Sequence, residues 1–197
     1  MKNAIIFQAV LLICQGALYL GIQKFEGPAH DVKSRIDDKI PFWQPGVFIY
    51  VLWYPMIAVF PLLLFDGNRE MYVLYILSII ADIVISSIVY LAYPTSFQRP
   101  EPSNQGAGKL VSILHVCNYK GKNCMPSMHC SMCFIIAFFS TLCASEQGLL
   151  YGGFFLLSMA IVASTVLTKQ HVIIDVITGL LAAVLSVSIA AWIQHMM

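Results

Sequence analysis

Six stretches of the chain are almost wholly apolar, and short polar or charged segments separate them. They cover residues 4–22, 45–65, 71–93, 126–144, 147–167 and 171–193. Each is close to the ~20 residues that a helix needs to cross the hydrocarbon core of a bilayer. Apolar side chains surround each stretch instead of lining one face, and they do not alternate as in barrel strands. The pattern therefore predicts an all-α fold, an integral membrane bundle of six transmembrane helices.

The amino-acid composition also indicates a membrane protein. Hydrophobic residues make up 59% of the 197 positions and charged residues only 11%, whereas a soluble protein carries about 25% charged residues. The net charge of +1 offers no broad basic surface for nucleic acid. These values exclude a soluble enzyme, a disordered regulator and a nucleic-acid-binding protein. We interpret residues 1–197 as a single six-helix membrane domain.

The connections between the apolar stretches are uneven, and three of them, including the two longest, fall on one membrane face. These are residues 23–44, 94–125 and 168–170. A loop as long as 94–125 is usually functional or disordered. Within the first loop, Asp31–Ile40 predicts a short interfacial helix followed by an aromatic anchor at Phe42 and Trp43. We therefore expect the chemistry of the protein at this face.

Asp175 lies one turn into the last apolar stretch, where an acid is expensive and suggests function. His171 precedes it by four residues, so both side chains share one helix face. A carboxylate beside one imidazole nitrogen fixes the tautomer and leaves the other nitrogen as a nucleophile or base. A buried hydrogen-bonded pair without catalytic function, or a pH-sensing pair, fits the same pattern.

Further polar residues fall at the same face. Pro126 opens the fourth stretch, and Ser127 and His129 follow in its first turn, where free N–H groups suit a phosphate. Arg99 and Lys169 add two cations at this face. Taken singly, these are a helix cap, an interfacial histidine and two snorkelling side chains. Taken together with His171 and Asp175, they supply what phosphoryl transfer needs.

The order and spacing of these residues resemble the type-2 phosphatidic acid phosphatase superfamily, whose members are six-helix membrane enzymes. Its first motif, K-x6-R-P, survives as Arg99-Pro100, and its second, P-S-x-H, is intact at residues 126–129. The third, S-R-x5-H-x3-D, matches at Ser164, His171 and Asp175. The order of the motifs, their placement on the helices and the number of spans agree over nearly the whole chain.

Two cations of the family pattern are absent. The lysine of the first motif is replaced by Ala92, and the arginine of the third by Thr165. Lys169 is the favoured substitute, with Lys120 and Lys122 as weaker ones. The chain therefore resembles a divergent branch, and its substrate need not be phosphatidic acid. Some relatives transfer a phospho-headgroup between lipids, which is an alternative function.

The resemblance implies a lipid phosphate phosphatase with a phosphohistidine intermediate. Arg99, Ser127 and Lys169 would bind the phosphoryl oxygens of a lipid phosphate substrate in the bilayer. His171, oriented by Asp175, would attack phosphorus. His129 would protonate the leaving oxygen. No metal and no cofactor is expected, since the sequence has neither a carboxylate cluster for Mg²⁺ nor a His-Glu-x-x-His zinc motif.

Other features leave alternatives open. Cys130 and Cys133 form a C-x-x-C string, and Cys117 and Cys124 form a loop pair, as in a membrane thiol oxidoreductase linked to quinone. A transporter or an inactive binding relative is a third possibility. Asp82, deep in the third stretch, favours an interhelical hydrogen bond over a proton relay.

Two arguments about orientation disagree. Nine of the eleven basic residues lie on the face with the motifs, which by the positive-inside rule would be cytoplasmic. Relatives of this size usually have an extracytoplasmic site, and a Cys117–Cys124 disulfide would need an oxidising compartment. We expect a multi-pass cell-membrane protein whose site lies on the extracytoplasmic face.

Overall fold

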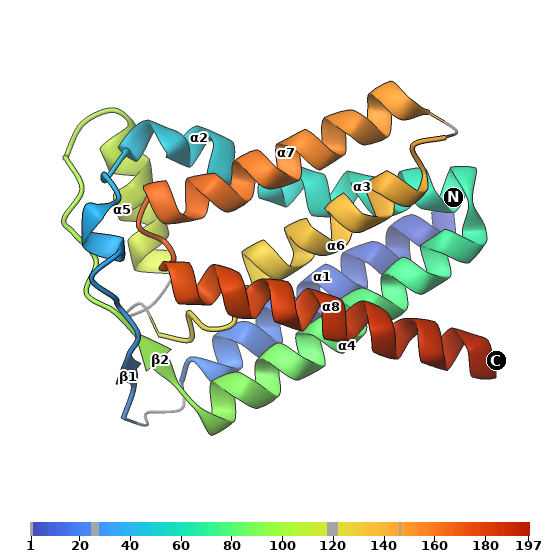
Figure 1. Ribbon diagram of the computed structural model, residues 1–197, viewed down its shortest axis with the longest axis horizontal. Coiled ribbons are helices and arrows are strands. Elements are labelled where there is room, and N and C mark those ends of the chain that lie inside the picture. The colour runs from blue at the N-terminus through green and yellow to red at the C-terminus, as the bar shows by residue number, and fades with distance from the viewer. Residues whose placement is uncertain (1, 25–27, 118–121, 146) are drawn as a thin grey trace.

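The protein is a bundle of long helices, seen in a computed structural model that describes residues 2–24, 28–117, 122–145 and 147–197 (Figure 1). The long helices are α1 (Lys2–Ile22), α3 (Trp53–Gly67), α4 (Arg69–Ala92), α6 (Met128–Leu142), α7 (Gly148–Leu167) and α8 (Ile173–Met196). Shorter elements are β1 (His30–Asp31), η1 (Asp37–Lys39), η2 (Gln44–Gly46), α2 (Val47–Tyr50), β2 (Thr95–Ser96) and α5 (Ala107–Cys117).

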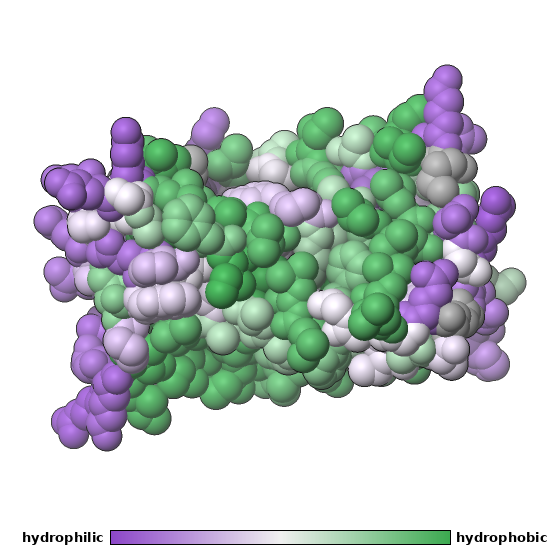
Figure 2. Space-filling view, turned by 90° about the horizontal axis from the view of Figure 1, so that it is seen from above, coloured by the Kyte–Doolittle hydropathy of each residue, from purple (hydrophilic) through white to green (hydrophobic). Residues whose placement is uncertain are grey.

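Five helical segments are long and apolar enough to cross a membrane. They are Lys2–Ile22, Gln44–Gly67, Arg69–Ala92, Gly148–Leu167 and Ile173–Met196. Hydrophilic residues gather at the two ends of the molecule, and hydrophobic residues cover the face between them (Figure 2). The structure is thus consistent with the predicted helical membrane protein.

The predicted fourth span, residues 126–144, is shorter than expected. Helix α6 has 15 residues, which at 1.5 Å per residue is about 22 Å, and so the count of six full spans is not confirmed. Ten of its residues are buried, because α6 packs against α3, α4, α7 and α8. A helix enclosed by its neighbours need not match the thickness of the bilayer.

Close packing of α8 against α6 joins the two motif-bearing helices. A Cβ atom on Gly179 would lie 3.0 Å from the carbonyl oxygen of Ser127, so a larger residue would require the two helices to shift apart by a few tenths of an ångström. The N-terminus of α6 therefore lies beside the first turns of α8. Aromatic residues fill the bundle farther from this end, with Phe60 and Phe139 in contact with Tyr75.

The described parts of the connections 23–44, 94–125 and 168–170 lie at one end of the bundle (Figure 1). Strands β1 and β2 pair in parallel, with His30 opposite Thr95. Helix α5 packs its Val111 and Leu114 against Val47 and Tyr50 of α2. The predicted helix at Asp31–Ile40 is only the short η1 turn, and Asp37 and Ile40 form hydrogen bonds with Lys169 and Ile173, described below, instead of with a continuing helix.

Candidate active site

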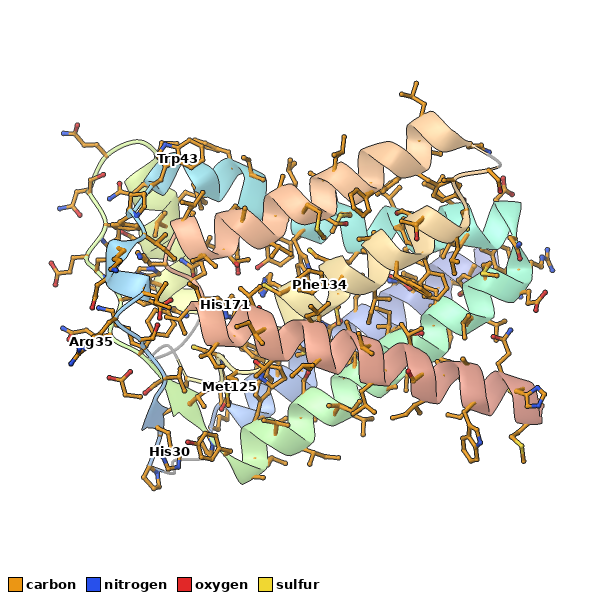
Figure 3. All side chains as sticks on the ribbon, viewed as in Figure 1. His30, Arg35, Trp43, Met125, Phe134 and His171 are labelled. Atoms are coloured by element: carbon orange, nitrogen blue, oxygen red, sulfur yellow. The ribbon has the colours of Figure 1, made fainter. Side chains whose placement is uncertain are left out.

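His171 and Asp175 form a buried hydrogen-bonded pair at the polar end of α8 (Figure 3). His171 Nδ1 lies 3.2 Å from Asp175 Oδ2. The same carboxylate oxygen accepts the backbone N–H of Val172 at 3.0 Å and so caps α8. Asp175 is fully buried and His171 is 7% exposed. The carboxylate therefore fixes the ring and leaves Nε2 as the nitrogen for chemistry.

The N-terminus of α6 is tied to this pair. Ser127 caps α6 by accepting the N–H of Cys130 at 3.2 Å, and its own N–H donates to the carbonyl of Asp175 at 3.1 Å. The hydroxyl of Ser127 is thus used in capping. The N–H groups of Met128 and His129 are first-turn donors without intrahelical partners. These backbone groups suit an anion better than the serine side chain does.

His129 follows in this first turn and faces His171. The centroids of the two rings are 5.8 Å apart. Residues from two motifs, 42 positions apart in the chain, are therefore neighbours at this end of the bundle.

Arg99 completes this group as an available cation. Its Nη2 donates to the carbonyl of Gln170 at 3.2 Å, while its Nε is buried and has no partner among the residues that the structure describes. No carboxylate forms an ion pair with Arg99 within the same residues. Burial and the charge of Arg99 lower the pKa of His115 to about 4. A positive potential with a free donor is what a phosphate requires.

Lys169, expected to bind phosphate, donates to backbone carbonyls in this structure. Its backbone is in the left-handed region, with φ of 55°. Its Nζ donates to the carbonyls of Asp37 and Ile40, both at 2.7 Å. The ammonium group thus secures the loop of residues 23–44 to the α7–α8 connection. Sequence reasoning placed Lys169 at the correct face but did not foresee that backbone carbonyls would occupy it.

Asp37 is a residue of the site that sequence reasoning missed. Its Oδ1 accepts the N–H of Ile173 at 2.8 Å, and its Oδ2 accepts the N–H of Ser34 at 2.8 Å. Burial would raise the pKa of Asp37, but a hydrogen bond from the Ser34 hydroxyl, the two backbone hydrogen bonds and the charge of Lys169 lower it below its usual value. Asp37 thus holds the start of α8, and with it His171, from a distant loop.

Aromatic side chains pack against His129, and the sequence analysis did not predict them. The ring of Trp53 lies 4.2 Å from that of His129, centroid to centroid. Tyr50 stacks on the same ring at 4.9 Å, and its hydroxyl lies 2.8 Å from Nε2. No sequence motif marks Tyr50 or Trp53, since they read as ordinary residues of an apolar stretch.

Two cavities meet at the site. The first, of about 390 Å³, is lined mainly by apolar residues of α1, α3, α4 and α6, together with Arg99, His129 and His171. The second, of about 470 Å³, lies among the polar loops and includes Lys33, Asp38 and Gln98. Arg99 and His171 line both cavities, whereas His129 lines only the apolar one.

Ala92 and Thr165, where the family pattern has a lysine and an arginine, are uncharged. Ala92 is exposed at the end of α4. Thr165 is buried, and its carbonyl accepts the N–H groups of Gln170 and His171 at 2.9 and 3.1 Å. Lys122 pairs its backbone with Ser96, and Lys120 lies outside the described residues. Thr165 therefore shapes the loop that carries His171.

The cysteines give little support to thiol chemistry. Cys130 and Cys133 are free thiols and fully buried. Burial, and then the charge of Asp175, raises the pKa of Cys124 to about 12, so its reactive thiolate form is rare. The side chain of Cys117 lies outside the described residues, and so does any disulfide between Cys117 and Cys124. Asp82 accepts a hydrogen bond from Ser131 at 2.7 Å, which is the expected link between α4 and α6.

Comparison with known proteins agrees with the geometry. The model of a protein family, the PAP2 superfamily, matches residues 71–197, which include Arg99, His129, His171 and Asp175. No curated protein and no solved structure matches the chain. Members of the superfamily are generally phosphatases acting on phosphate esters. Because the match covers well over half of the sequence and every residue of the predicted motifs, the chain belongs to the PAP2 superfamily.

Proposed function

We propose that this protein is a membrane lipid phosphate phosphatase that works through a phosphohistidine intermediate without a metal ion or cofactor. One observation carries the proposal. A carboxylate-held histidine, an unpaired buried arginine nitrogen and a second histidine converge at the end of an apolar cavity. The cavity suits a lipid, and the three side chains suit its phosphate.

The reaction proceeds in two displacements. Nε2 of His171 attacks phosphorus, and the bond between phosphorus and the lipid oxygen breaks as His129 gives that oxygen a proton. Arg99 and the N–H groups at the start of α6 stabilise the charge on the phosphoryl oxygens. Water then attacks the phosphohistidine, its proton passes to His129, and the phosphorus–nitrogen bond breaks to release phosphate.

The chain itself supplies every group in this scheme. The described residues contain no cluster of three His, Cys, Asp or Glu side chains that could hold a metal ion. Because the proposed scheme uses no metal ion, activity is expected to persist in excess EDTA.

The lipid enters sideways from the bilayer. Leu12 and Gly16 of α1 and Ile57 of α3 line the apolar cavity, and only 17% of the most apolar part of α1 is buried. Movement of this loosely packed helix would admit an acyl or isoprenoid chain.

The site lies on the extracytoplasmic face, and α6 is counted as the sixth, short span. A cysteine at exposed Glu101 should react with an impermeant thiol reagent in intact cells; labelling only after lysis would contradict this orientation.

Headgroup transfer between lipids is a second candidate, which the polar cavity favours. In an in-line displacement the leaving lipid oxygen lies on the side of His129, and hence of the apolar cavity. A substituent that remains on phosphorus would extend toward Arg99 and the polar cavity. A phosphodiester could thus lose its lipid alcohol and pass its headgroup to another lipid alcohol in the same place.

The test is product release from a panel of lipid phosphates, diphosphates and phosphodiesters in detergent with EDTA. Phosphate release by the wild type and its loss by more than about 10⁴-fold in His171→Ala would support the phosphatase. A matched control is His195→Ala, because His195 lies exposed at the opposite end of α8. Headgroup transfer that requires His171 would favour the second candidate. A fully active His171→Ala would contradict both.

A further inference from the structure

Tyr50 makes a specific contact with the histidine that acts as acid and base. Its Oη lies 2.8 Å from Nε2 of His129, and its side chain is fully buried. Among the described residues its hydroxyl has no second hydrogen-bond partner. A buried hydroxyl without a partner would be destabilising, so the contact with Nε2 is the one that satisfies it.

This contact determines which nitrogen of His129 faces the substrate. Tyr50 occupies Nε2, whereas Nδ1 has no hydrogen bond within the part of the chain that is described. The ring lines the apolar cavity beside Arg99 and His171. Trp53 packs on it with a centroid distance of 4.2 Å and opposes rotation. Nδ1 is therefore the nitrogen left for a substrate oxygen.

We propose that Tyr50 is a positioning residue that holds Nε2 of His129 and so presents Nδ1 to the leaving oxygen, an inference that rests on the proposed function. The family match begins at residue 71, so Tyr50 lies outside it. Tyr50 touches no reacting atom. It acts only through the ring of His129.

A phenol suits a histidine that must change its protonation state. A tyrosine hydroxyl can donate or accept a hydrogen bond. In this cycle Nε2 keeps its proton while Nδ1 loses and regains one, so the hydroxyl oxygen accepts from Nε2–H throughout. When protonated His129 gives its Nδ1 proton to the leaving oxygen, the proton on Nε2 stays in the contact with Tyr50. The reverse transfer, from water to Nδ1, restores the starting state.

The test is Tyr50→Phe, which removes one oxygen atom and keeps the stacked ring. Loss of one neutral hydrogen bond should lower kcat about tenfold and leave KM within about twofold. In protein labelled with ¹⁵N-histidine, the Nε2 signal of His129 should move, and the signals of the other histidines should stay. A purely structural role for Tyr50 would not move this one resonance selectively.

Tyr75→Phe is the matched control. Tyr75 is also fully buried but packs against Phe60 and Phe139, so kcat and the His129 signal should be unchanged. An unchanged His129 signal in Tyr50→Phe would overturn the proposal. So would a wild-type Nε2 signal typical of a nitrogen without a hydrogen bond, a measurement that needs no variant. Because the spectra require no substrate, failure of the proposed function would be seen separately, as inactive wild type with the expected signals.

Discussion

His171 and His129 border the same cavity, but their surroundings differ in kind. His171 lies in a polar region, where Asp175 accepts its Nδ1–H and Asp37 and Lys169 hold the loop around it. His129 lies in an aromatic region, where Trp53 packs on its ring and a phenol meets Nε2. One ring is held by charge and the other by stacking and a neutral hydroxyl.

The difference follows from what each ring must do. A nucleophile needs one nitrogen kept as a donor so that the other keeps its lone pair, and a carboxylate, which only accepts, ensures this. An acid that later acts as a base must bind and release a proton. A fixed negative charge beside it would favour the protonated form. A neutral hydroxyl supports both states.

The largest effect on this comparison is expected from Asp175→Asn. The amide can still cap α8, but it no longer fixes the tautomer of His171. Turnover should fall about 10⁴-fold, as it does for the same change in a serine-protease histidine-carboxylate pair. That loss is far larger than the one expected for Tyr50→Phe. Single-turnover phosphate release measures it, with helicity by circular dichroism as the control for folding. Similar losses in the two variants would remove the proposed distinction.

Lys169→Met tests whether the polar region positions His171 or binds phosphate directly. Since Nζ already donates to two carbonyls, we expect a fall in kcat of about tenfold as the loop loosens. The inhibition constant of vanadate, a phosphate analogue, should change little. Arg99→Met is the comparison variant, and its vanadate constant should rise about 100-fold. An equal rise in Lys169→Met would restore the lysine to the phosphate site.

The smallest effect concerns stability against acid. The pKa of Asp37 is lower in the folded protein than its ordinary value of 3.8. The charged form therefore stabilises the fold above that value, and this contribution is lost as the pH falls through the folded pKa. Asp37→Asn should lose about 1–2 kcal/mol of unfolding free energy at neutral pH. Its remaining stability should decline less than that of the wild type at low pH.

Thermal unfolding in detergent across the acid range measures this difference. Asp38→Asn is the control, because Asp38 is the exposed neighbour of Asp37 and pairs with Lys33 at the surface. Exposed ion pairs contribute little, so this variant should behave as the wild type does. Parallel curves for wild type and Asp37→Asn would show that the carboxylate does not stabilise the α7–α8 connection.

The sequence by itself determined the helical membrane class and the family. Long apolar stretches favour helices in lipid whatever their neighbours are, so five apolar helical segments lie close to five of the six predicted spans. The pair of His171 and Asp175 was also predictable, because four residues of helix bring two side chains to one face. The roles of Arg99 and His129 followed from motif order and remain predictions until they are measured.

Only the tertiary structure decided what surrounds these residues. Tyr50 meets His129 across 79 positions, and Asp37 reaches the start of α8 across 136. Neither spacing leaves a periodic signal, because such contacts depend on how whole helices and loops pack. The same holds for Lys169 and the short α6. The hydrogen-bond partners of Lys169 and the length of α6 depend on segments that are distant in the sequence, so the residues around each position do not reveal them.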